Sequence, residues 1–220
     1  MGKLIVLEGL DGSGKSTQYE MLKKVFGDRA AYASFPDYDT PSGGTVKQYL
    51  SGEFGGSADS VNAYAASAFY AVNRVASFLK DDWGRVYREG GLVFTARYTT
   101  SNAVHQASKL PQGEWEDYFA WLEDTEYRLY GLPKPDLVIY LRTDAATSKA
   151  KVISRGEGVD IHEADSDYMS RCARAAEAAA KYGDWQILDV LENGRMLPPD
   201  VIHRAIVERI ASVCESGEDE

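Results

Sequence analysis

The chain is poor in cysteine and has no long hydrophobic run. Cys172 and Cys214 are its two cysteines among 220 residues, and their wide separation favours two free thiols in a reducing compartment over a disulfide framework. The apolar stretch from Leu4 to Leu7 is too short for a signal peptide or a membrane span. Val6 stands where a myristoylation signal needs serine or threonine. These absences predict a soluble cytoplasmic protein.

Positive charge is also scarce. Lysine and arginine number 24 against 34 aspartates and glutamates, which gives a net charge of −10. Nucleic acids and anionic membranes select basic surfaces, so neither is an expected partner. A small anionic ligand held by a few arginines is compatible with this balance. Residues 215–220, ESGEDE, concentrate acid at the end of the chain and predict a solvated, disordered tail.

Short apolar runs alternate with helical patterns along the chain, without an internal repeat or a long linker. This alternation predicts βαβ units and an α/β fold with a mostly parallel sheet. The expected strands are Lys3–Leu7, Ala31–Phe35, Leu92–Thr95, Asp136–Leu141 and Gln186–Val190. The expected helices span about 15–26, 59–80, 99–109, 113–130, 144–154, 166–182 and 199–214. The polar segment 156–165 is either a lid over a site or an exposed turn.

The first predicted strand runs into a phosphate-binding pattern. In KLIVLEGLDGSGKST, residues 3–17, the pattern G-x-x-x-x-G-K-[ST] is matched by Gly9, Gly14, Lys15 and Ser16. Glycines let backbone amides curl around phosphate oxygens, and the following helix adds the partial positive charge of its N-terminus. Lys15 is expected to reach the β- and γ-phosphates, and the Ser16 hydroxyl to ligate magnesium. The chain is therefore expected to bind a nucleoside triphosphate, in the first place ATP.

Asp11 is an unusual residue inside such a loop. An acid is electrostatically unfavourable among phosphate-binding amides unless it faces another group. It is expected to accept a hydrogen bond from a sugar hydroxyl, to touch a magnesium shell or to point into solvent.

The predicted helix 59–80 has two different faces. Tyr70 and Arg74 lie one turn apart, where a ring can stack on a nucleobase and a guanidinium can bond its carbonyl edge. The alternative is a tyrosine packed under a neighbouring helix and an arginine in an ion pair. The opposite, apolar stripe consists of Val61, Ala65, Ala68, Val72, Val75 and Leu79. With Ala76, the small residues of this helix indicate either a core face or a homodimer seam.

With these pieces the chain resembles the thymidylate kinases, a family of P-loop nucleoside monophosphate kinases. The resemblance runs from Lys3 to the last helix and is carried by LIVLEGLDGSGKST, SFPDYDTPSGG, FYAVNR, ARYTTSN and GLPKPDLVIYL. It implies a single domain over residues 1–214 with the three-layer P-loop NTPase fold, a five-stranded parallel sheet flanked by helices, and a short lid. It also implies transfer of the γ-phosphoryl group of ATP to dTMP with Mg²⁺ as cofactor, and a homodimer packed through helices.

The resemblance assigns a base-binding set. Tyr70 occupies the position at which the family stacks an aromatic ring on thymine, and Arg74 the position that bonds the O4 edge. Ser101 and Asn102 are expected near the base, where an amide can pair with an imide.

Further acceptor-site roles follow from the same resemblance. Asp11 is expected near the sugar 3′-hydroxyl and the phosphates, and Phe35 along the monophosphate pocket. His105 lies near the position that checks for a deoxyribose, with an exposed helical histidine as the competing interpretation. No metal constellation is expected among His105, His162 and His203.

The phosphate-transfer residues are implied in the same way. Arg97 is expected to bridge the donor and acceptor phosphates and to form the catalytic group with Lys15 and Asp11. Magnesium is expected on Ser16, with Asp11 or Glu8 in its outer shell. The implied ATP-binding residues are Gly9, Gly12, Ser13, Gly14, Lys15, Ser16, Thr17 and, at the base of the lid, Arg155, which would stack on adenine or reach phosphate.

The chain departs from the family pattern at positions that carry charge. The family usually has aspartate before the arginine matched by Arg97, where this chain has Ala96. It usually has an arginine shortly after Phe-Pro, where this chain has Asp37-Tyr38-Asp39 and where Lys47 is the available substitute.

The loop and lid add to this deficit. Gly12 and Ser13 stand where some members have a catalytic arginine, and the lid offers only Arg155 among several acids. A missing arginine of this kind commonly lowers turnover by about 10³-fold or more, and a lost outer-shell magnesium ligand typically costs about 10- to 100-fold. Two alternatives therefore accompany the kinase interpretation: a nucleotide-binding protein of this fold with weak or no kinase activity, and a kinase for another deoxynucleotide or a deoxynucleoside.

Overall fold

A five-stranded parallel sheet forms the centre of the molecule. The computed structural model describes residues 1–144, 146–148, 151 and 166–215. The strands are β1 (Lys3–Gly9), β2 (Ala30–Ser34), β3 (Leu92–Ala96), β4 (Leu137–Arg142) and β5 (Gln186–Asp189). They lie in the order β2-β3-β1-β4-β5, and every neighbouring pair is parallel. The predicted sheet and its five strands are confirmed, with ends shifted by a residue or two.

The helices agree with the predicted alternation in outline. The α-helices are α1 (Lys15–Phe26), α2 (Gly44–Leu50), α3 (Ala63–Lys80), α4 (Asp82–Arg88), α5 (Thr99–His105), α6 (Trp115–Glu123), α8 (Ser166–Tyr182) and α9 (Pro199–Glu215). Short 3₁₀ turns are η1 (Gly27–Arg29), η2 (Pro41–Gly43), η3 (Ala58–Ser60), η4 (Ala107–Lys109) and η5 (Gln112–Glu114). Helix α6 continues as a π-helix, η6 (Asp124–Leu129).

Several predicted helices are divided or incomplete. The span 59–80 contains η3 before α3, 99–109 changes from α5 to 3₁₀ geometry, and 113–130 changes from α6 to π geometry. Helices α2 and α4 and a small hairpin, β6 (Leu191–Glu192) with β7 (Arg195–Met196), were not predicted, because elements this short show little periodicity. Most of the predicted helix 144–154, the lid 156–165 with Arg155, and the tail beyond Glu215 lie outside the described residues.

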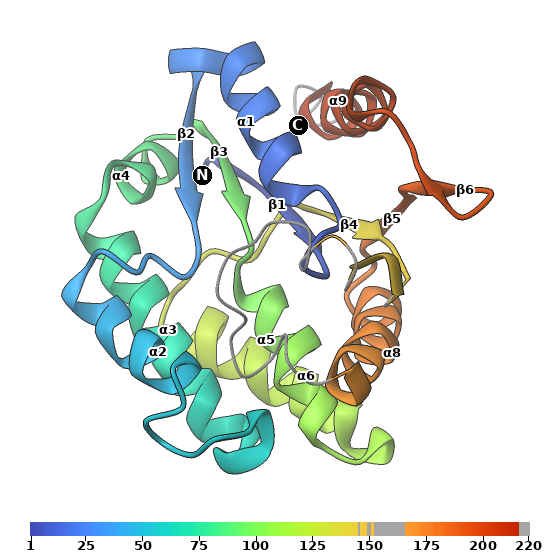
Figure 1. Cartoon of the computed structure of the whole chain (residues 1–220). Coiled ribbons are helices and arrows are strands. Elements are labelled where there is room, and N and C mark those ends of the chain that lie inside the picture. Colours follow the sequence, from blue (N-terminus) through green and yellow to red (C-terminus); the bar gives the residue numbers. More distant parts are fainter. Residues whose placement is uncertain (145, 149–150, 152–165, 216–220) are drawn as a thin grey trace.

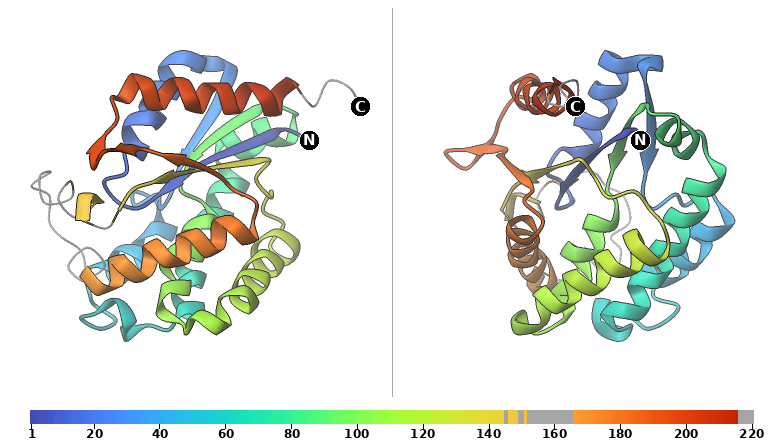
Figure 2. Two further views of the ribbon diagram at one scale, coloured as in Figure 1. Left: turned by 90° about the vertical axis from the view of Figure 1, so that its right-hand side faces the viewer. Right: turned by 180° about the vertical axis from the view of Figure 1, so that it is seen from behind.

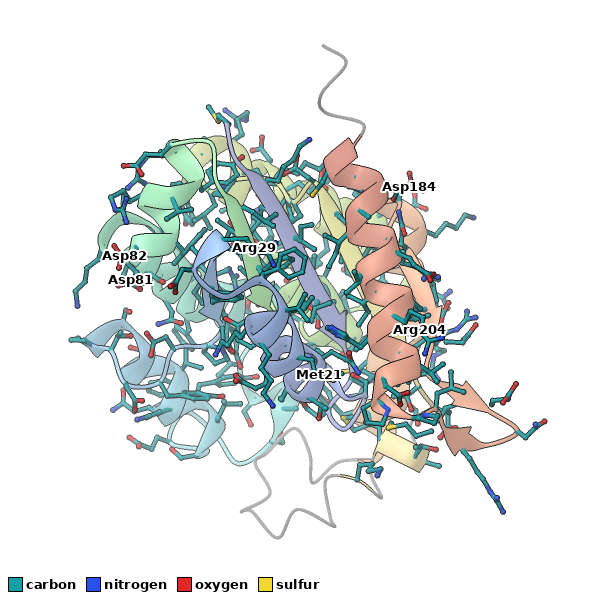
Figure 3. The ribbon with its side chains drawn as sticks, turned by 90° about the horizontal axis from the view of Figure 1, so that it is seen from above. Met21, Arg29, Asp81, Asp82, Asp184 and Arg204 are labelled. Atoms are coloured by element: carbon teal, nitrogen blue, oxygen red, sulfur yellow. The ribbon has the colours of Figure 1, made fainter. Side chains whose placement is uncertain are left out.

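Helices cover both faces of the sheet and give three layers (Figures 1 and 2). On one face α1 and α9 lie side by side, with Met21 and Arg204 marking them in Figure 3. Their apolar residues, including Leu22 and Ile206, pack on Ile5 and Leu7 of β1. Helices α4, α5 and α8 pack on the other face. Because both faces are covered, β1 and β4 are continuous apolar runs rather than alternating ones.

The apolar stripe of α3 faces outward. Val72 is 58% exposed and Leu79 is 71% exposed, and Ala68 is exposed as well. The side of the helix that packs inward is polar and contains the buried residues Ser67, Asn73, Arg74 and Ser77. The core-face interpretation of the small residues is therefore wrong for Ala68, because the polar inner side chains find hydrogen-bond partners on neighbouring segments. Ala76 is half-buried. Val61, Ala65 and Val75 are half-buried.

The sheet order places the functional loops at one edge. Strands β2 and β3 lie on one side of β1, and β4 and β5 lie on the other, so the strand order switches direction at β1. In open α/β sheets, ligands bind outside the carboxyl ends of the strands at such a switch point. The loops that follow β1, β2 and β3 meet there. Within the described residues, no helix has the length and apolar character needed to cross a lipid bilayer.

Candidate active site

The loop after β1 has the geometry of a phosphate site. Gly12 and Gly14 have φ angles of 81° and 93°, which side chains other than glycine rarely adopt. Gly14 precedes α1 and provides no side-chain cap, so the first turn of α1 presents its amides to an anion. Ser16 and Thr17 are exposed on that turn. The expected phosphate loop is thus present in its expected conformation.

Lys15 lies back over the loop that precedes it. Its side chain is buried, and Nζ donates to the carbonyl oxygens of Gly9 at 2.5 Å and Leu10 at 2.7 Å. Ser13 is fully buried, and its amide donates to Leu10 at 3.1 Å. Its Oγ has no hydrogen-bond partner in the part of the chain that the structure describes. Ser13 therefore shapes the loop rather than presenting a side chain at its surface.

Arg97 joins the phosphate loop to α5. It follows β3 with a left-handed φ of 63°, and its Nη2 donates to Asp11 Oδ1. Its Nη1 lies 3.0 Å from His105 Nε2 and 3.9 Å from Glu8 Oε1. Burial alone would raise the pKa of Asp11, but the charges of Arg97 and Lys15 outweigh it and hold this pKa well below its ordinary value. The acid in the loop thus has a cationic partner.

Glu8 is a fully buried carboxylate at the end of β1. Its Oε1 accepts from the amide of Gly9 at 2.9 Å, and its Oε2 accepts from the hydroxyls of Thr100 at 2.7 Å and Ser101 at 2.6 Å. These contacts fix the first turn of α5 to β1. Both acids expected near magnesium are thus engaged by protein groups, Glu8 by an amide and two hydroxyls and Asp11 by Arg97.

A cavity of about 360 Å³ opens beside the phosphate loop. Its lining comes from the loops after β1, β2 and β3 and from α3 and α5. The lining includes every residue expected at the acceptor site, namely Asp11, Phe35, Tyr70, Arg74, Arg97, Ser101, Asn102 and His105. Residues that are separated by up to 94 positions in the chain are thus brought to one pocket. Their individual roles stay predictions.

Arg74 lies at the far side of this cavity and is 1% exposed. It forms a two-point ion pair with Glu126 of η6, with Nε 2.7 Å from Oε2 and Nη2 2.5 Å from Oε1. Burial alone would lower the pKa of the guanidinium, but the charge and hydrogen bonds of Glu126 outweigh it and raise this pKa. The ion-pair interpretation of Arg74 is therefore confirmed, and its contact with a nucleobase stays a prediction that its place in the cavity lining allows.

Tyr70 and His105 also lie at the cavity wall. Tyr70 is half-buried, and its ring meets Tyr49 edge-on with centroids 6.3 Å apart. His105 is buried, with Nδ1 3.6 Å from Cys172 Sγ, so the interpretation as an exposed histidine is wrong. The described residues contain no cluster of three or more histidines, cysteines or acids that could hold a metal ion. His162 lies outside them.

Sequence reasoning missed three residues that shape the site. Asn73 Oδ1 accepts from Asp37 N at 2.8 Å, and its Nδ2 donates to Asp37 O at 3.1 Å, which ties the loop after Phe35 to α3. Gln106 is buried at the cavity wall, and its Oε1 has no hydrogen-bond partner among the described residues. Glu126 is the third. A polar residue on the inner face of α3 was the available signal for Asn73, whereas Gln106 and Glu126 lie within patterns that indicated only helix.

The structure describes two of the positions at which the sequence departs from the family pattern, whereas the lid with Arg155 lies outside the described residues. Lys47 is exposed, lies 3.8 Å from Asp39 and does not line the cavity, so it does not replace the missing arginine in this conformation. Ala96 is buried at the end of β3, in register with Leu7 of β1. Its methyl group packs in the core below α1 and supplies no oxygen to a metal.

Comparisons with known proteins identify the fold and the family. The solved structure of thymidylate kinase from Candida albicans superposes with a TM-score of 0.73, at 23% identity, over 96% of this chain and 92% of that one, and supports the fold. Thymidylate kinases from two strains of Mycobacterium tuberculosis, CDC 1551 / Oshkosh and H37Rv, are each 31% identical over 221 residues, covering 90% of this chain and 99% of theirs. The family model described as thymidylate kinase matches residues 7–197. The chain belongs to the thymidylate kinase family.

Proposed function

We propose that this chain transfers the γ-phosphoryl group of ATP to dTMP with magnesium as cofactor, through the residues around the cavity. Membership of the family makes it an ATP-dependent nucleotide kinase, and phosphorylation of dTMP to dTDP is the reaction of that family. One observation carries the assignment to residues: the expected acceptor residues line one cavity of about 360 Å³, and Asp11 belongs both to this cavity and to the phosphate loop. Donor and acceptor phosphates would therefore meet at Asp11 and Arg97.

The donor site is the phosphate loop. Gly9 to Thr17 would cradle the triphosphate of ATP with backbone amides, as the uncapped start of α1 allows. The Lys15 ammonium would exchange its contacts with the loop carbonyls for the β- and γ-phosphates. The exposed Ser16 hydroxyl fits the single protein ligand that magnesium often takes beside phosphate oxygens. When bound, magnesium neutralises charge on the phosphates.

The acceptor site is the cavity. Tyr70 would stack on the thymine ring, and Arg74 and Asn102 would meet its polar edge. Phe35 would line the phosphate end, where His105 supports Arg97. Gln106 Oε1, buried without a partner among the described residues, would accept a hydrogen bond from the nucleotide.

Arg97 would carry the charge of the transferred group. It sits between the phosphate loop and the cavity, where its guanidinium reaches Asp11 on one side and His105 on the other. Phosphoryl transfer depends mainly on positioning and on charge stabilisation of this kind. Arg155 is a further candidate on the ATP side that lies outside the described residues.

A second function, nucleotide binding with weak turnover, is favoured by one observation. Among the described residues, the arginines that line the cavity are Arg74 and Arg97, and each is already paired with an acid. Such pairing reduces the positive charge available to the transition state. ADP release with dTMP should be measured alongside calorimetric binding of ATP and dTMP. Tight binding of both nucleotides without turnover would replace the kinase by this second function.

The same assays extend to the mechanism and to the acceptor. Competition among dTMP, dUMP, dCMP and thymidine would identify the preferred acceptor. Lys15→Ala should lower kcat by at least about 10²-fold, whereas Lys24→Ala, on an exposed position of the same helix, should not. Wild-type turnover in Lys15→Ala would remove the phosphate-loop mechanism.

The assembly proposed for the chain is a homodimer that buries the outer face of α3. Val72, Leu79 and Ala68 expose apolar surface in a row along this helix. Exposed apolar patches of this kind commonly mark protein interfaces. Tyr70 and Arg74 of the same helix line the cavity, so a dimer formed here would contact the outer face of the helix whose inner face forms the acceptor site.

A further inference from the structure

Glu126 is a buried carboxylate that does not line the cavity. It is 1% exposed and lies in the π-helix η6, between α6 and the segment that leads to β4. Single π turns inside helices frequently occur at functional sites. Four side-chain contacts reach its two oxygens, which is a full complement for a carboxylate.

The contacts divide evenly between the two oxygens. Oε1 accepts from Arg74 Nη2 at 2.5 Å and from Asn102 Nδ2 at 3.1 Å. Oε2 accepts from Arg74 Nε at 2.7 Å and from Thr99 Oγ1 at 2.9 Å. One carboxylate thereby fixes two residues that line the acceptor cavity, Arg74 and Asn102.

Glu126 determines which N–H groups of Arg74 remain available to a ligand in the cavity. A guanidinium has five N–H groups. Two point to Glu126, and Nη1 directs a third to the carbonyl oxygen of Tyr98 at 3.3 Å. Two N–H groups are left for the cavity that Arg74 lines. Arg74 thus presents donors there from a side chain that cannot rotate away.

The same carboxylate orients the amide of Asn102. Its Nδ2 donates to Glu126 at 3.1 Å and to the carbonyl oxygen of Ser67 at 3.3 Å, so both amide hydrogens are in use. The carbonyl Oδ1 is therefore turned away from Glu126. Since both residues line the same cavity, the groups left there for a ligand are donors on Arg74 and an acceptor on Asn102.

We propose that Glu126 is the positioning residue that sets the hydrogen-bond polarity of the acceptor site, so that the site reads the imide edge of a pyrimidine. The imide edge of thymine or uracil offers a carbonyl acceptor next to an N–H donor, which matches Arg74 and Asn102. The edge of cytosine offers the reverse, an amino donor next to a ring-nitrogen acceptor. This inference rests on the proposed function, since it concerns the acceptor of that reaction.

Replacement by glutamine tests the polarity directly. An amide in place of the carboxylate puts an N–H₂ group where one oxygen stood. Each oxygen receives a donor from Arg74 and one from a second residue, so either orientation of the amide opposes two donors. The negative charge that balances Arg74 is lost as well. Glu126→Gln is therefore expected to release both Arg74 and Asn102 from their present orientations.

The experiment compares acceptors at saturating ATP. The kcat and KM for dTMP, dUMP and dCMP are measured in the wild type, in Glu126→Gln, in Glu126→Asp and in Asp124→Asn. Asp124→Asn removes an exposed carboxylate of the same π-helix, paired with Arg128, and is the matched control. Glu126→Asp keeps the charge that Arg74 needs while withdrawing its oxygens, so it tests the geometry if Glu126→Gln does not fold. Melting temperatures identify folded variants.

The expected result is a change in selectivity rather than a uniform loss. In Glu126→Gln the kcat/KM for dTMP and dUMP should fall by about 10-fold or more, as for one charged hydrogen bond, mainly through KM. The value for dCMP should fall much less, so that the dTMP-to-dCMP ratio drops by about the same factor. Glu126→Asp should lie between, and the KM for ATP should not change. Asp124→Asn should match the wild type.

Two results would overturn the inference, and they differ from failure of the proposed function. A folded Glu126→Gln or Glu126→Asp with the wild-type dTMP-to-dCMP ratio would show that Glu126 does not set polarity. An equal loss for all three acceptors would show a structural role alone. If the wild type neither bound nor phosphorylated dTMP, the proposed function itself would fail, and this inference with it.

Discussion

The Arg97 guanidinium donates to the carboxylate of Asp11, across the gap between the end of β3 and the phosphate loop. An acid inside a phosphate loop repels the ligand that the loop binds, unless a cation accompanies it. Here the cation comes from the neighbouring strand, and His105 supports it from the cavity side. The pair therefore connects the donor site to the acceptor site through one shared charge.

This pair predicts a stability difference that depends on pH. Because the folded pKa of Asp11 lies below its ordinary value of about 3.9, the ionised acid stabilises the fold above pH 4, and this contribution is lost as the pH falls through the folded pKa. Asp11→Asn lacks the contribution, so its melting temperature should lie below that of the wild type at pH 6 and approach it toward pH 3. Thermal unfolding over this range measures the difference. The exposed Asp117→Asn on α6 is the control, and a gap that stayed constant with pH would contradict the expectation.

Ala96→Asp should raise kcat when magnesium is limiting. The substitution places a carboxylate at the end of β3, next to Arg97, where the family usually has an acid. Groups that hydrogen-bond to the ligands of a metal change metal affinity or activity by about 10- to 100-fold. Magnesium titrations of the rate would measure the effect. Ala96→Asn controls for size, and a magnesium dependence equal to that of the wild type would make position 96 irrelevant to the metal.

Val72→Asp should convert the proposed homodimer into a monomer. Val72 is 58% exposed on the outer face of α3, and a charge there would be desolvated in an interface. Light scattering after size exclusion would measure the mass of both proteins. Val25→Asp on α1, where the wild-type residue is 46% exposed, is the matched control. A wild-type monomer would contradict the proposed dimer. A dimer that tolerated Val72→Asp would place its interface away from the outer face of α3.

Lys109 predicts a second pH-dependent difference in stability, in the alkaline range. Burial is the main cause that lowers its pKa to about 8, although Nζ donates to Tyr49 Oη at 2.6 Å. Below about pH 8 the ammonium is charged, and its burial lowers the free energy of unfolding. As the pH rises from about 8 toward the pKa of the unfolded lysine, the folded lysine loses its proton first and this destabilisation disappears. The stability of the wild type relative to Lys109→Met should therefore increase between pH 7 and pH 10. A difference in melting temperature that did not change over this range would show that Lys109 stays protonated.

Local patterns predicted the phosphate loop and the strand ends well. The spacing of Gly9, Gly14, Lys15 and Ser16 is a property of one short segment, and the structure gives it the expected turn. Ser101 and Asn102 follow a strand that was recognisable from Leu92 onward, so their approach to the cavity followed from the parallel sheet.

Long-range contacts could not be predicted in the same way. The inner face of α3 is polar because Tyr118, Asp37 and Glu126 supply its partners from distant parts of the chain. Periodicity separated the two faces of this helix but could not decide whether its small-residue stripe packs in the core or in a dimer seam. The π turn that carries Glu126 lies within a continuous helical pattern in the sequence, so no residue in it indicated a change from α to π geometry.

The backbone and the side chain of Arg97 act on the stability of the fold in opposite directions. A residue other than glycine with a φ of 63° carries a conformational cost of about 1 kcal/mol that glycine, and in part asparagine, would avoid. Only a long cationic side chain reaches Asp11 and His105 from this point of the chain. Glycine or asparagine at position 97 would relieve this backbone cost but would also remove the ion pair with Asp11, so the stability of the loop above pH 4 and the proposed chemistry both depend on the arginine.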